Sequence, residues 1–125
     1  MDETGFQAKD FLEFCNSLLN LIQSIDEEPT YRTIVNRCYL AAYVTAKTIL
    51  VSRGCHYTND YTDYHNVERD LRIEYENDGR FLQDSLSTLR EARGEADYDY
   101  PFHGFLDRRF VDHKIHLAKR IISKL

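Results

Sequence analysis

Residues 29–53 constrain the fold more than any other stretch, because they are apolar on nearly every side of a helix. Such a helix must be enclosed by other helices, and the alanines in it allow a neighbour to approach closely. Gly54 follows directly and is a natural helix stop. We therefore predict an all-α bundle with this helix at its centre. The apolar positions are Ile34, Val35, Cys38, Tyr39, Ala41, Ala42, Val44, Ala46, Ile49 and Leu50.

The flanking segments supply the other helices of the predicted bundle. Apolar residues at three-and-four spacing predict long helices over residues 5–25, 80–96 and 104–124. A shorter, more polar helix is predicted over residues 63–76. Because the connections are short, we expect an antiparallel bundle of four long helices and one short helix. We expect the whole chain, residues 1–125, to form one domain.

Composition places the chain among folded cytoplasmic proteins. Hydrophobic residues make up 42% of 125 residues, which is enough for a core. No apolar run is long enough to span a membrane, and the N-terminus lacks a signal-peptide pattern. The three cysteines are an odd number without paired spacing, which favours a reducing compartment. We therefore predict a cytoplasmic protein that makes no membrane contact.

Charge is distributed unevenly along the chain. Residues 101–125 hold six Lys or Arg and two Asp, a net charge of +4. Because the whole chain has a net charge of −5, the first hundred residues carry −9. One face of the last predicted helix is a basic stripe that either is simply solvated or contacts phosphate. Its histidines have too few hard ligands nearby to predict a metal site, and no cofactor motif is present. The stripe consists of Arg109, His113, His116 and Arg120.

Arg93 is the residue that most suggests a functional site. It falls on the same helical line as Leu82, Leu86 and Leu89, where a charged guanidinium is costly to bury without a partner. It therefore needs an acid, an interface or a ligand. The predicted helix 80–96 then frays into an acidic, tyrosine-rich turn before Pro101, so Arg93 either pairs with an acid such as Asp97 or serves function.

Tyrosine is abundant, with nine copies and no tryptophan. Several tyrosines fall in or near predicted loops, where they either stack on nucleic-acid bases or cap the small core. They are Tyr57, Tyr61, Tyr64, Tyr98 and Tyr100.

Two blocks of the sequence resemble the small HEPN-domain proteins of prokaryotes. Residues 36–46, with Arg37 and Tyr39, resemble that family's Ser-Arg-x-Tyr-Tyr-Ala pattern followed by an aromatic residue. Residues 89–98 resemble the Leu-x-x-x-Arg-x-x-Ala-Asp-Tyr block of one subgroup. Residues 64–67, which hold His65, resemble a histidine-containing segment of the same subgroup. The resemblance covers almost the whole chain and implies an all-α homodimer.

The resemblance also implies a chemistry. In ribonuclease members an arginine stabilises the scissile phosphate, and a histidine four to six residues later transfers the proton without metal. Here Arg93 keeps the arginine, but Tyr98 stands at the histidine position and Tyr100 at the position of a following tyrosine. Tyrosine, with a pKa near 10, is a poor base at neutral pH. Arg108 with His113, Arg109 with His116, and His103 are out-of-place alternatives.

Three functions follow as hypotheses. The first is a regulatory HEPN protein of a toxin–antitoxin or defence-type module, dimeric, binding RNA or a protein partner, with a degenerate ribonuclease motif. The resemblance implies a nucleotidyltransferase as partner and Tyr100 as the acceptor of its modification. The second is an active, metal-independent endoribonuclease that uses Arg93 and Tyr98. The third is a plain helical interaction module. Predicted nucleic-acid contacts are Arg37, Arg93, Arg109, His113, His116 and Arg120.

Overall fold

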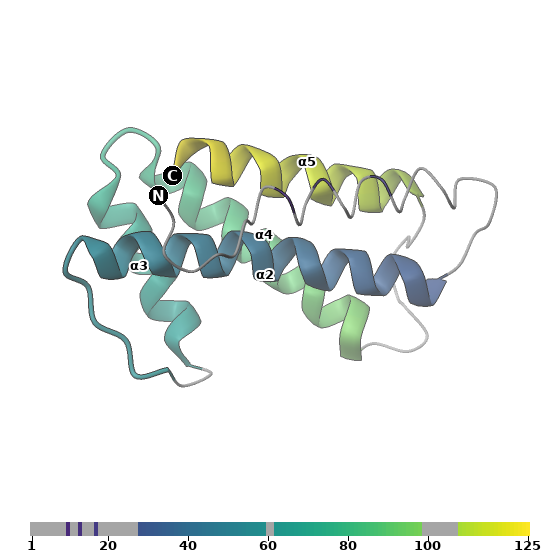
Figure 1. Cartoon of the computed structure of the whole chain (residues 1–125), viewed down its shortest axis with the longest axis horizontal. Helices are drawn as coiled ribbons and strands as arrows, with labels where there is room; N and C mark the ends of the chain where they lie inside the picture. Colours follow the sequence, from purple (N-terminus) through teal and green to yellow (C-terminus); the bar gives the residue numbers. More distant parts are fainter. Residues whose placement is uncertain (1–9, 11–12, 14–16, 18–27, 60–61, 99–107) are drawn as a thin grey trace.

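The computed structural model describes residues 10, 13, 17, 28–59, 62–98 and 108–125. Within these residues the chain forms helices and no strand, which confirms the all-α prediction. Residues 10, 13 and 17 are helical, and the rest of the first predicted helix lies outside the described residues. The other helices are α2 (Glu28–Ser52), α3 (Asp63–Glu74), α4 (Gly79–Tyr98) and α5 (Arg108–Lys124) (Figure 1).

Helix α2 contacts α3, α4 and α5, so the central position predicted for it is confirmed. Helices α3 and α4 run in opposite directions, as do α4 and α5 (Figure 1). Val44, which we counted among the enclosed apolar residues, is 39% exposed. The buried core joins α2 to the leucines of α4 and the aliphatic residues of α5; its largest fully buried side chains are Ile34, Val35, Leu50, Val67, Leu71, Leu82, Leu86, Leu89, Ile115 and Ile121.

The ends of α2, α3 and α4 lie within two residues of the ends predicted from the sequence. Gly54 has a φ of 100°, the left-handed conformation of a helix stop, and confirms the predicted end of α2. Helix α3 ends at Glu74, two residues before the predicted end. Helix α4 runs through Gly94 to Tyr98, two residues beyond its predicted end. An interior glycine costs a helix only about 1 kcal/mol, which the packing of α4 on three neighbouring helices offsets.

None of the described helices is both long and apolar enough to cross a membrane.

Candidate functional site

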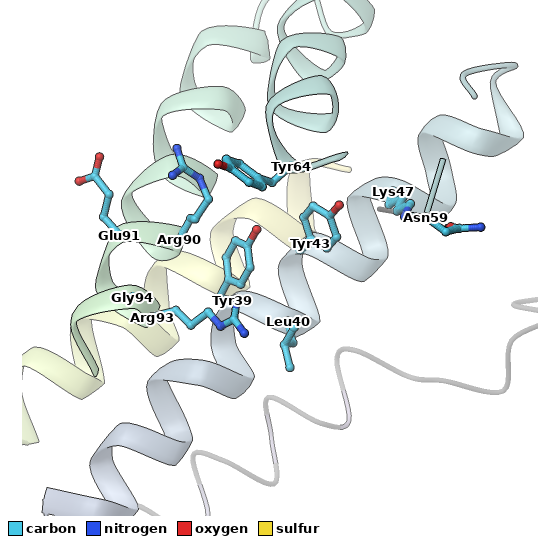
Figure 2. A pocket seen from close by; sticks show the side chains of 10 residues that line it. All are labelled: Tyr39, Leu40, Tyr43, Lys47, Asn59, Tyr64, Arg90, Glu91, Arg93 and Gly94. Carbon is cyan, nitrogen blue, oxygen red and sulfur yellow. Dashed lines mark hydrogen bonds between the residues drawn. The ribbon is translucent and has the colours of Figure 1, made fainter. Parts of the chain in front are cut away.

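Helices α2 and α4, with the start of α3 and the loop before it, line a pocket of about 760 Å³. Figure 2 shows that Arg90 and Arg93 approach it from α4, while the tyrosines of α2 stand between them and Lys47. The pocket is lined by Tyr39, Leu40, Tyr43, Lys47, Asn59, Tyr64, Arg90, Glu91, Arg93 and Gly94.

The spacing of the α2 residues explains how they come to one wall. Tyr39, Tyr43 and Lys47 are four residues apart, so they lie above one another on one face of the helix. The rings of Tyr39 and Tyr43 stack, with centroids 5.5 Å apart and planes 27° from parallel. The Arg93 guanidinium lies 5.8 Å from the Tyr39 ring centroid, at the range of a cation–π contact. This wall therefore combines flat aromatic surface with a fixed positive charge.

Both stacked tyrosines stay protonated at neutral pH. Burial, followed by the nearby Asp63 and Glu68 carboxylates, raises the pKa of Tyr43 to about 12. Burial also raises the pKa of Tyr39, with Tyr43 adding to the effect. A phenol with so high a pKa does not accept a proton as a base near pH 7. Tyr39 is only 4% exposed, so the accessible ring surface of this wall belongs mainly to Tyr43, and both hydroxyl groups are neutral.

Arg90 is held in the pocket wall by a carboxylate of another helix. Its Nε donates to Glu68 Oε2 at 2.8 Å and its Nη2 to Glu68 Oε1 at 3.3 Å, a two-point arrangement. Nη2 also donates to the Ser87 hydroxyl at 3.2 Å. The guanidinium carbon lies 4.6 Å from the Tyr64 ring centroid. Because Glu68 is nearly buried, the pair fixes both the α3–α4 contact and the position of Tyr64.

A second ion pair closes the other end of the pocket. Lys47 Nζ donates to Asp63 Oδ2 at 3.0 Å and to Asn59 Oδ1 at 3.2 Å. Asp63 Oδ1 accepts from the Thr58 amide at 3.2 Å and the Thr58 hydroxyl at 2.9 Å. Burial alone would raise the pKa of Asp63, but these hydrogen bonds and the Lys47 charge together lower it. Asp63 is therefore an ionised anchor for Lys47.

The Asp63 contacts give a pH dependence that can be measured. A carboxyl group whose pKa is lowered in the folded state contributes stability above its ordinary value of 3.8, and this is lost as the pH falls through the folded-state pKa. Asp63→Asn should thus be less stable than the native chain at pH 7, and the difference should shrink below about pH 4. Urea midpoints of both proteins at pH 7, 5 and 3 measure this, and a constant difference would contradict it.

Of the residues singled out from the sequence, Arg93, Tyr39 and Tyr64 line this pocket. Arg37 and His65 are exposed and do not line it. Asp97 and Tyr98 belong to the last turn of α4, but their side chains lie outside the described residues, as do Tyr61, Tyr100 and His103 altogether.

The α5 stripe is exposed, as predicted, but none of its residues lines the pocket. Arg109, His113, His116 and Arg120 all face solvent. His116 lies 3.7 Å from Asp112, and the Arg120 guanidinium lies 4.7 Å from the Phe81 ring centroid. Partial burial, then Lys114 and His116, lower the pKa of His113. No group of three metal-ligating side chains occurs within the described part of the chain.

Sequence reasoning missed four residues that shape the site: Lys47, Asp63, Glu68 and Arg90. Asp63 and Glu68 share the buried face of α3 with Val67 and Leu71. Their spacing carries the same signal that singled out Arg93, a charge in register with apolar residues. Applying that test to residues 63–71 would have found both carboxylates, though not their partners.

Comparison with known proteins defines the class to which this bundle and its pocket belong. The family model of the HEPN domain matches residues 6–125. No curated protein and no solved structure matches the chain. The chain therefore belongs to the HEPN family, and its pocket brings together the two blocks that resemble that family.

Proposed function

We propose that this HEPN protein is a regulatory, dimeric member of a toxin–antitoxin or defence-type module that binds single-stranded RNA in the pocket without cleaving it. The observation that carries the proposal is the placement of Arg93 beside the stacked pair Tyr39–Tyr43. Single-stranded RNA is bound by aromatic rings that stack on its bases and by cations that neutralise its phosphates. The pocket offers both within one wall, with ring surface from the partly exposed Tyr43 and a cation from Arg93.

Binding without cleavage is favoured by the groups that line the pocket. None of its ten lining residues is a histidine, and the raised pKa values of Tyr39 and Tyr43 prevent either phenol from acting as a base. The backbone of α4 is continuous from Arg93 to position 98. Position 98 is five residues after Arg93, so it lies about 140° around the helix axis from Arg93. A general base typically supplies a factor of about 10² to 10⁴ in rate, so its loss leaves binding as the main activity.

The alternative function, a metal-independent endoribonuclease, also requires Arg93, because the Arg93 guanidinium would stabilise the scissile phosphate. That function needs a proton acceptor that enters the pocket from elsewhere, such as Tyr98 or a histidine. The modification of Tyr100 by a nucleotidyltransferase also remains a prediction, because Tyr100 lies outside the described residues.

Arg93→Ala is expected to weaken binding of a labelled single-stranded RNA 12-mer about 10- to 150-fold, because a charged hydrogen bond to phosphate is worth about 1.5 to 3 kcal/mol. Fluorescence anisotropy in chelator measures the affinity, and a gel of the same samples reports cleavage. The matched control is Arg80→Ala. Arg80 also lies on α4, is 81% exposed and does not line the pocket.

The outcomes separate the three functions. Weaker binding by Arg93→Ala alone, with intact RNA throughout, supports the proposal. Equal affinity of the native chain and both variants would overturn it and favour a plain interaction module. Chelator-resistant cleavage that disappears in Arg93→Ala would establish the ribonuclease instead.

A further inference from the structure

The end of the pocket formed by Lys47 and Asn59 has a chemical character different from the Arg93 end. Lys47 lies beside Tyr43, with Nζ 5.9 Å from the ring centroid, and Asn59 lies next to Lys47 (Figure 2). Tyr39 and Lys47 are eight residues apart, about 12 Å along α2. A strand whose phosphate contacts Arg93 would therefore present a different nucleotide to Lys47.

The Lys47 end of the pocket offers N–H donors to a ligand. An ammonium group has three donors and no acceptor, and two of these donors go to Asp63 Oδ2 and Asn59 Oδ1. Because Lys47 cannot accept, the Asn59 atom facing it is the oxygen, and the remaining group of that amide is a donor. Among the described residues, none accepts a hydrogen bond from this NH₂ group.

The side-chain hydrogen-bond acceptors of Asp63 and Asn59 at this end are not available to a ligand. The Asp63 side chain is 1% exposed, and its two oxygens are occupied by Lys47 and Thr58. Asn59 has a φ of 61°, a left-handed conformation that asparagine tolerates better than most residues, and its side-chain oxygen is bound to Lys47. The Lys47 end is therefore a fixed set of N–H donors.

Fixed N–H donors favour a base whose edge carries hydrogen-bond acceptors. Guanine has two adjacent acceptors, O6 and N7, and pairing of lysine with this edge is a common specific contact. Adenine and cytosine place an amino donor at the corresponding position, which would face the ammonium group. We propose that Lys47, positioned by Asp63 and Asn59, selects a guanine bound beside Tyr43. This rests on the proposed RNA binding and adds base selectivity to it.

The test compares 12-mers of adenosine that carry guanosine, inosine, 7-deazaguanosine or adenosine at one central position. The native chain should bind the guanosine oligomer roughly tenfold more tightly than the all-adenosine one, within the range for one good base-edge contact. Inosine keeps O6 and N7 and should retain the preference, whereas 7-deazaguanosine lacks N7 and should lose part of it. Arg93→Ala should weaken all four equally.

Two variants remove the N–H donors of Asn59 and Lys47. Asn59→Asp removes the NH₂ donor and places a second carboxylate against Lys47. The ratio of the affinities for the guanosine and all-adenosine oligomers should therefore fall toward one. Asn66→Asp is its matched control, because Asn66 is exposed on α3 and does not line the pocket. Lys47→Met would leave the Asp63 charge buried without its partner, so it is combined with Asp63→Asn. Circular dichroism confirms that each variant is folded.

The results separate this inference from the proposed function. A guanosine preference lost in Asn59→Asp and in the double variant, but kept in Asn66→Asp and Arg93→Ala, supports both. Binding without base preference, or a preference that Asn59→Asp leaves intact, overturns the inference while RNA binding stands. No binding of any oligomer by the native chain overturns both.

Discussion

Replacing Glu68 with leucine is expected to lower the free energy of unfolding by about 2 to 3 kcal/mol. Removing one partner of a buried ion pair leaves the other charge uncompensated, which typically costs about 3 to 5 kcal/mol. The effect is reduced here because the Arg90 side chain is 28% exposed and keeps its bond to Ser87. Urea denaturation followed by circular dichroism measures the change.

The matched control is the double variant Glu68→Leu with Arg90→Leu. Replacement of both charges by apolar side chains of similar size is often neutral, so this variant should recover most of the lost stability. If the double variant is less stable than either single one, the pair is not the source of the effect. The double variant also removes one pocket cation while keeping the fold, and thus distinguishes a loss of RNA affinity from a loss of structure.

The fold was predictable because its main signals are local to each helix. The apolar positions of residues 29–53 predicted the central helix, and Gly54 predicted its end. The end of α4 was less predictable: Gly94 is a poor helix residue, yet the helix, which contacts three other helices, continues two residues beyond the predicted end to Tyr98. Tertiary packing overrides a propensity difference of about 1 kcal/mol.

The site was only partly predictable, because its ion pairs join different helices. Spacing within one helix reports which side chains share a face, and it singled out Arg93. It does not report which residue of a neighbouring helix lies opposite. Lys47 and Asp63 are 16 residues apart and Glu68 and Arg90 are 22 apart, so each pairing depends on how the helices rotate against each other. The resemblance supplied Tyr39 and Arg93, but not the pairs that hold the pocket walls.

Alanine is expected to have opposite effects at the two glycines of α4. At Gly79 a Cβ atom would lie 2.5 Å from the Arg72 carbonyl oxygen and 2.9 Å from the Arg72 Cα. These are backbone atoms of α3 and cannot swing away, so the helices must separate. We expect Gly79→Ala to destabilise the protein by about 1 to 3 kcal/mol, the usual cost of overpacking. Urea midpoints measure the loss.

At Gly94 a Cβ atom would meet nothing within 4 Å, and the residue lies inside a helix. Gly94→Ala should therefore stabilise the protein by about 0.5 to 1 kcal/mol, because alanine loses less backbone entropy on folding. Destabilisation by this variant would contradict the open space beside it. Gly94 also lines the pocket next to Arg93, where a methyl group would hinder a phosphate approaching the guanidinium. If RNA binds there, Gly94→Ala should raise stability and lower RNA affinity, a combination that a merely structural glycine would not produce.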